Sequence, residues 1–174
     1  ARVSKDEDGW CAAPAQRETV VRREVSVDAY PALVDHSFYR QRHEWPSMED
    51  RYPVVPMTML VAVMMDVARE LVPERIPVGL ERVRALRWLA VAPPATATLR
   101  SVPDGPDRVR VTIDGYAAGT VLLAGGYPAP PAGERPVLRG ERPAPVDAAR
   151  LYRENWMFHG PAYAGVAEVA AVAD

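Results

Sequence analysis

Cysteine is almost absent from this chain of 174 residues, which contains only Cys11. One thiol excludes an intrachain disulfide and leaves no second thiol for a cysteine zinc site. Histidine is also scarce, with three residues and no dense cluster of carboxylates or thiols beside them, so the sequence predicts no bound metal. A reducing, cytoplasmic setting fits this composition.

An excess of charge of one sign and long apolar runs are lacking as well. The formal net charge is −2 with both signs interspersed, so no basic face for a nucleic-acid partner is expected. The longest apolar stretch, residues 57–68, contains Asp66 and is too short to span a bilayer, which predicts no membrane segment. Residues 5–8 are charged and argue against a signal peptide. No glycine-rich phosphate loop occurs, and we expect no protein-bound cofactor.

What the sequence does contain is a long apolar segment at residues 57–72, which predicts a central helix that is buried nearly all round. Pro56 suits the first turn of this helix, and Pro73 ends it. Alternating valines and charges predict a half-buried strand at 19–27. Further strands are predicted at 78–91, 96–102, 109–114 and 119–125. The pattern predicts an α+β fold in which a curved antiparallel sheet wraps around the helix.

Proline marks the end of this unit. Six prolines and two glycines between residues 128 and 145 predict a stiff, extended linker. We therefore predict four segments: a linker from an upstream domain at 1–18, a first folded unit at 19–127, the proline-rich linker at 128–145, and the beginning of a second unit at 146–174. In this last segment Asp147 is expected to cap a helix that reaches Tyr152, and residues 165–172 form a possible strand.

His36 is the strongest candidate for chemistry. It follows Asp35 after the first strand, twenty residues before Pro56 opens the helix. In a sheet wrapped around a helix, this imidazole would face the helix N-terminus, where free N–H groups polarise a thioester carbonyl. An imidazole titrates near neutrality and can accept an α-proton without a large pKa shift. A surface or capping histidine is the competing interpretation. His43 lies in a polar loop and is interpreted as a solvated side chain without a role, whereas His159 is interpreted as structural from its Gly-Pro turn.

Two segments together resemble the dehydratase domains of polyketide synthases, which have a double hot-dog fold. LVDH at 33–36, followed by PVVPMTML at 53–60, is similar to the DH pair and the VVPGT-like turn that precede the central helix of the first hot-dog. Residues 151–166, with FHGP at 158–161, look like the segment that opens the second hot-dog. The resemblance covers roughly residues 19–172. It is closer to iterative synthases of the polyunsaturated-fatty-acid, glycolipid and enediyne type than to modular ones.

The resemblance implies dehydration of a β-hydroxyacyl thioester, carried on the phosphopantetheine arm of an acyl carrier protein. His36 would be the catalytic base, and backbone N–H groups at the helix start would hold the thioester oxygen. A carboxylic acid of the second hot-dog would protonate the leaving hydroxyl. The implied substrate-binding residues are Pro56, Met57, Thr58, His159, Gly160 and Pro161.

The same resemblance places the carboxylic acid beyond Asp174, so we expect the chain to be inactive by itself. The implied partners are the acyl carrier protein, the rest of the second hot-dog, other synthase domains and a second copy in a homodimer.

Departures from the family pattern keep a second interpretation open. The family usually has glycine four residues after the histidine and proline nine after it, whereas Arg40 takes the first place and Pro56 comes twenty residues later. Met57 stands where glycine is usual. The inserted loop at 37–52 and the absent glycine favour a non-catalytic hot-dog that binds acyl chains or shapes the synthase dimer. A single hot-dog thioesterase is a weaker third interpretation, because the helix acids Asp66 and Glu70 lie at its distal end.

Overall fold

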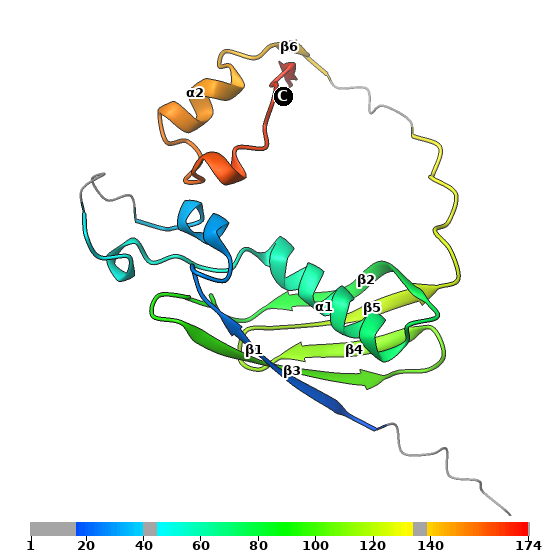
Figure 1. Cartoon of the computed structure of the whole chain (residues 1–174). Coiled ribbons are helices and arrows are strands. Elements are labelled where there is room, and N and C mark those ends of the chain that lie inside the picture. Colours follow the sequence, from blue (N-terminus) through cyan, green and yellow to red (C-terminus); the bar gives the residue numbers. More distant parts are fainter. Residues whose placement is uncertain (1–16, 40–44, 134–138, 174) are drawn as a thin grey trace, which may run out of the picture.

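Five strands form one antiparallel sheet in the order β1-β3-β4-β5-β2. The computed structural model describes residues 17–39, 45–133 and 139–173, so Cys11, Arg40, His43, Asp174 and nearly all of the predicted linker 1–18 lie outside the described residues. Figure 1 shows helix α1 (Met57–Leu71) lying across one face of the sheet. The strands are β1 (Thr19–Val25), β2 (Ile76–Ala85), β3 (Ala95–Pro103), β4 (Arg108–Ile113) and β5 (Ala117–Ala124).

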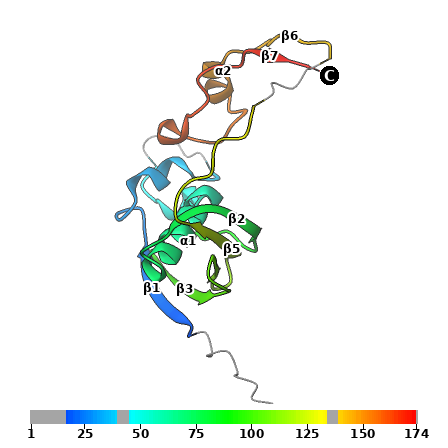
Figure 2. The ribbon, with the colours of Figure 1, turned by 90° about the vertical axis from the view of Figure 1, so that its right-hand side faces the viewer.

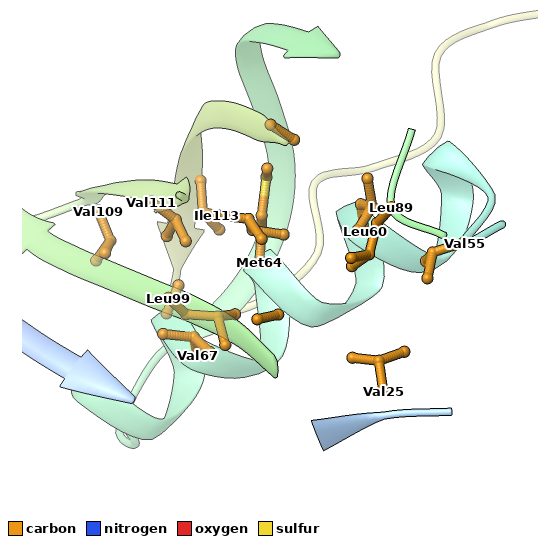
Figure 3. Packing of buried hydrophobic residues seen from close by; sticks show 14 of the residues in the cluster. Val25, Val55, Leu60, Met64, Val67, Leu89, Leu99, Val109, Val111 and Ile113 are labelled. Carbon is orange, nitrogen blue, oxygen red and sulfur yellow. The ribbon is translucent and has the colours of Figure 1, made fainter. Parts of the chain in front are cut away.

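The core lies between α1 and the inner face of the sheet. Leu60, Met64, Val67 and Ala68 form the buried face of the helix, at the spacing of one helical stripe. They pack with buried residues that alternate along the strands, among them Leu99, Val109, Val111 and Ile113, as Figure 3 shows. This alternation is the period of two that puts every second side chain of a strand on the core side.

The helix is less buried than the sequence predicts. Thr58, Ala62 and Asp66, on the side opposite Met64, are exposed. The reason is that a single sheet covers only one face of α1. The prediction of a helix buried nearly all round was therefore wrong, although its bounds were predicted to within one residue at each end.

The predicted strand at 78–91 was wrong in its second half. Strand β2 ends at Ala85, after a register shift near Arg82, whose φ of 54° is left-handed. The chain that follows leaves the sheet and pairs elsewhere. The Val55 N–H donates to the Leu89 carbonyl at 2.9 Å, and the Val91 N–H donates to the Pro53 carbonyl at 3.0 Å. These bonds fix the segment that leads into α1.

The C-terminal part contains two short strands and a helix. Strand β6 (Arg142–Pro143) pairs with β7 (Ala171–Val172), and helix α2 (Ala148–Arg153) begins after Asp147, whose side chain accepts a hydrogen bond from the Arg150 N–H. The predicted cap is confirmed, but the strand predicted at 165–172 is reduced to its last part. Figures 1 and 2 show this part beyond the first turn of α1, beside the 3-10 helix η1 (Pro31–Asp35). Within the described residues, no helix is long and apolar enough to cross a membrane.

Candidate active site around His36

His36 is held by two contacts with one residue of the neighbouring segment. It follows η1, and its side chain and backbone together are only 4% exposed. The Val54 N–H donates to the His36 carbonyl at 3.1 Å, and the Val54 carbonyl lies 2.8 Å from His36 Nδ1. Both the backbone and the ring of His36 are therefore tied to the chain that enters α1. The alternative of a surface histidine is wrong.

This contact decides which ring nitrogen can act as a base. A carbonyl oxygen only accepts hydrogen bonds, so Nδ1 must carry the proton it donates to Val54. In the neutral ring Nε2 then bears the lone pair. Burial lowers the pKa of His36 from its ordinary value of 6.5, the bond to Val54 opposes this, and the charge of nearby His159 lowers it further. The neutral form is therefore favoured at neutral pH.

The start of α1 provides backbone donors close to this segment. Pro56 is extended and buried, and it precedes the first helical residue, Met57. The N–H groups of Met59 and Leu60 already donate to the Pro56 carbonyl. The N–H groups of Met57 and Thr58 belong to the first turn, where a helix supplies no carbonyl partner, and no side chain caps this helix start. They can donate to an oxygen atom of a ligand.

The FHGP turn of the C-terminal part covers His36. The ring centroids of Phe158, His159 and Tyr163 lie 5.1, 5.4 and 5.2 Å from that of His36. The Gly160 N–H donates to the Asp35 carbonyl at 2.7 Å, and Pro161 begins the 3-10 helix η3 (Pro161–Tyr163). A segment more than 120 residues away in sequence thus forms one wall around the ring.

The predicted site residues fall into two groups, one that contacts Asp35 and His36 and one that follows Val54 in the chain. His159 contacts His36 directly, while Gly160 and Pro161 are held beside it through Asp35. Pro56, Met57 and Thr58 follow Val54, the ring's hydrogen-bond partner. The first group is therefore tied to His36 by contacts and the second through Val54, which precedes it in the chain, and the catalytic and binding roles predicted for these residues stay predictions.

Other members of the site were missed at the sequence level. The chain has two phenylalanines, Phe38 and Phe158. The Phe158 ring contacts His36, and the Phe38 ring lies 5.7 Å from that of Phe158. Phe38 also contacts Trp88 edge-on at 4.8 Å. The rarity of phenylalanine, with one copy beside each motif, was a signal that could have pointed to them. Val54 lies in the motif at 53–60, but nothing in the sequence indicated its contact with His36, because it acts through its backbone.

An apolar cavity of about 240 Å³ adjoins the start of α1. Its lining residues are Val55, Met57, Leu60, Ala85, Leu86, Arg87 and Trp88. Trp88 is 52% exposed, and it connects the cavity to the aromatic rings near His36 through its contact with Phe38. The cavity suits an apolar group more than a charged one. Within the described ranges, no group of three or more His, Cys, Asp or Glu side chains could hold a metal ion.

No protein-family model matches the sequence, and no curated protein matches it significantly. Among solved structures, the chain is similar to the dehydratase domain of a mycocerosic acid synthase-like polyketide synthase, with a TM-score of 0.59 and 16% identity over 90% of this chain and 52% of that chain. The chain has the hot-dog fold of polyketide synthase dehydratase domains. The bifunctional dehydratase-cyclase domain of ambruticin biosynthesis gives a TM-score of 0.49 and 21% identity over 90% of this chain and 56% of that chain.

The chain spans about half the length of each of these structures. The prediction of an α+β hot-dog is confirmed by this likeness and by the observed sheet and helix. The boundaries predicted for the two units and their linker stay predictions.

Proposed function

We propose that this chain supplies the base-bearing half of a dehydratase, a hydro-lyase that converts a β-hydroxyacyl thioester on an acyl carrier protein into an α,β-enoyl thioester. The observation that carries the proposal is the buried His36, whose Nδ1 proton is directed to the Val54 carbonyl. This arrangement leaves Nε2 as the proton acceptor at neutral pH.

In the proposed reaction, Nε2 of His36 takes the α-proton of the thioester. The electron pair of that C–H bond forms the Cα–Cβ double bond as the Cβ–O bond breaks. A carboxylic acid of the second hot-dog, which the resemblance places outside this chain, donates a proton to the departing hydroxyl, so water leaves. The N–H groups of Met57 and Thr58 hold the thioester oxygen while negative charge accumulates on it.

The same proposal assigns the substrate and the partners. The acyl group arrives on the phosphopantetheine arm of the carrier protein, and the protein itself contributes no cofactor. The cavity beside Met57 is large enough for part of an acyl chain. The rest of the second hot-dog completes the site, other synthase domains flank it, and two copies form a homodimer.

The test is replacement of His36 in the full-length protein, assayed with a 3-hydroxyacyl thioester on its carrier protein. We expect His36→Ala to lower the dehydration rate by a factor of about 100 or more, because proton transfer by a positioned group contributes about 10²–10⁴-fold. Asp28→Ala, an exposed carboxylate in the same region, serves as the matched control. An unchanged rate in the folded His36→Ala protein would refute the proposal.

The cavity also favours the second candidate, a non-catalytic hot-dog that binds acyl chains. Its lining residues are apolar except for Arg87, and Met57 narrows the approach to the helix start where the family has glycine. This candidate requires that His36→Ala leave the products of the synthase unchanged. It also requires that Leu86→Trp, at an exposed residue that lines the cavity, weaken binding of an acyl thioester in the same protein.

A further inference from the structure

Asp35 makes two contacts with the FHGP turn. Its backbone carbonyl accepts a hydrogen bond from the Gly160 N–H at 2.7 Å, and its carboxylate Oδ2 accepts one from the Ala162 N–H at 2.8 Å. A backbone N–H that donates to a carboxylate makes a charge-assisted bond, stronger than one between neutral groups. One residue of η1 thus holds two positions of a turn that lies far away in the sequence.

Gly160 is required here by space. An ideal Cβ atom at this position would lie 2.6 Å from Asp35 Cγ and 2.8 Å from Asp35 Cβ. The φ and ψ of Gly160, −80° and −175°, are extended backbone that any residue adopts. The glycine is therefore explained by the close approach of Asp35 to the turn.

The Asp35 carboxylate does not orient the His36 ring by binding it. Nδ1 of that ring is already engaged by the Val54 carbonyl. The effect of Asp35 on His36 runs through the turn, which brings Phe158, His159 and Tyr163 to within 5.1–5.4 Å of the ring centre. Among the described residues, the titratable side chains seen in contact with the His36 ring are His159 and Tyr163 of the turn, and Asp35 precedes His36 on η1.

We propose that Asp35 is a positioning residue that docks residues 158–163 onto His36, so that the second unit sets the surroundings of the base in the first. The inference rests on the proposed function for the role of His36, but the docking itself does not depend on activity. In the Asp35-His36 pair, Asp35 then docks the turn, whereas His36 accepts the proton.

The first test is an NMR titration of His36 in this chain, with His36→Ala used to assign its signals. In Asp35→Ala the turn is released, the ring gains water, and the charge of His159 moves away, so the pKa of His36 rises toward 6.5. If the Asp35 charge acted on His36 directly, its removal would lower that pKa instead. The opposite signs separate positioning from electrostatics.

Two further variants keep the test sharp. Asp35→Asn retains an oxygen that accepts from the Ala162 N–H, so the pKa of His36 stays near its native value. Gly160→Ala perturbs the same contact from the other side and raises the pKa as Asp35→Ala does. Backbone amide signals of β3, β4 and β5 report whether the sheet stays folded. An unchanged or lowered His36 pKa in folded Asp35→Ala and Gly160→Ala overturns the proposal.

The activity test uses the full-length protein. We expect Asp35→Ala to lower kcat/KM for dehydration about tenfold or more, and Asp35→Asn to restore most of it, because misplacing groups around a reacting centre is costly. Equal losses in both variants contradict the docking role. If the native protein shows no dehydration while the His36 titration follows the expected pattern, the proposed function fails and the docking stands.

Discussion

At the scale of single residues, the state of His36 follows from what surrounds it. Burial disfavours the imidazolium, and the fixed Nδ1 proton leaves one nitrogen to accept another. A buried neutral histidine must gain a proton when acid unfolds the protein. The same property that suits the residue to remove a proton therefore makes the fold sensitive to acid.

We predict that His36 makes stability fall as pH decreases below 6.5. Its folded pKa lies below 6.5, so the unfolded chain binds more protons in this range, and the free energy of unfolding decreases until pH passes the folded pKa. One such group contributes at most about 1.4 kcal/mol per pH unit. Urea unfolding at pH 7.5 and at 5.5 measures the loss. His36→Gln should show a smaller loss, and an equal one would contradict the assignment.

The sequence pointed to His36 and to residues 159–161 because the motifs that contain them are local, and the roles predicted for them stay predictions. It missed Val54, Phe158 and Tyr163. Val54 acts through its peptide group, which no side chain announces, and the two rings matter only because Asp35 brings their segment to His36. Contacts made across more than 100 residues are fixed by tertiary structure and leave no periodic pattern in the sequence.

At the scale of elements, α1 is stabilised through its sheet-facing stripe. Met64 has no exposed surface, and its sulfur atom lies near Gly119 of β5. Most helices in proteins owe their stability to such packing on one face. The opposite face of α1 contributes less.

We predict that Met64→Ala lowers the free energy of unfolding by about 2–5 kcal/mol, since it removes buried atoms and leaves a cavity. Met65→Ala is the matched control, because this neighbour is only partly buried and its loss should cost clearly less. Chemical denaturation of both variants gives the comparison. Similar losses at the two positions would show that the helix is not packed on one side.

The helix and four of the strands could be predicted because apolar periodicity is a local property. The failure at 86–91 has a physical cause. These residues are apolar enough for a strand, but after the irregularity at Arg82 the backbone hydrogen bonds of Leu89 and Val91 are made with Val55 and Pro53. Apolar composition indicates burial and cannot indicate the pairing partner. The burial of α1 was predicted to be too complete, because its apolar sequence was taken to mean that other elements pack on all of its faces.

At the scale of the whole molecule, the hot-dog unit and the C-terminal part contact each other through η1 and η3. Residues 125–133 after β5 are exposed and contain neither helix nor strand. A connection of this kind sets the effective concentration of one part near the other. The length of this connection should therefore affect the free energy of unfolding far less than the residues that dock the turn onto His36.

We predict that inserting Gly-Ser-Gly-Ser between Pro131 and Ala132 changes the free energy of unfolding by less than about 1 kcal/mol, because doubling a flexible loop costs only about 0.6 kcal/mol. The His36 pKa should stay near its native value. The same insertion between Val55 and Pro56 serves as the contrast, since it separates the Val54 contact from the helix start and should destabilise the protein strongly. A large cost at Pro131 would mean that the connection itself holds the two parts.

Gly160 and Asp35 face each other with no room to spare, and this has an evolutionary consequence. At Gly160 there is no space for a side chain, so alanine is already too large and bulkier replacements destabilise the contact little further. At Asp35 the contact requires an acceptor oxygen, so the effect of a substitution depends on whether the new side chain supplies one. In a library of all single substitutions, the replacements of Gly160 should therefore cause similar losses, whereas those of Asp35 should be ranked by how well the new side chain accepts a hydrogen bond.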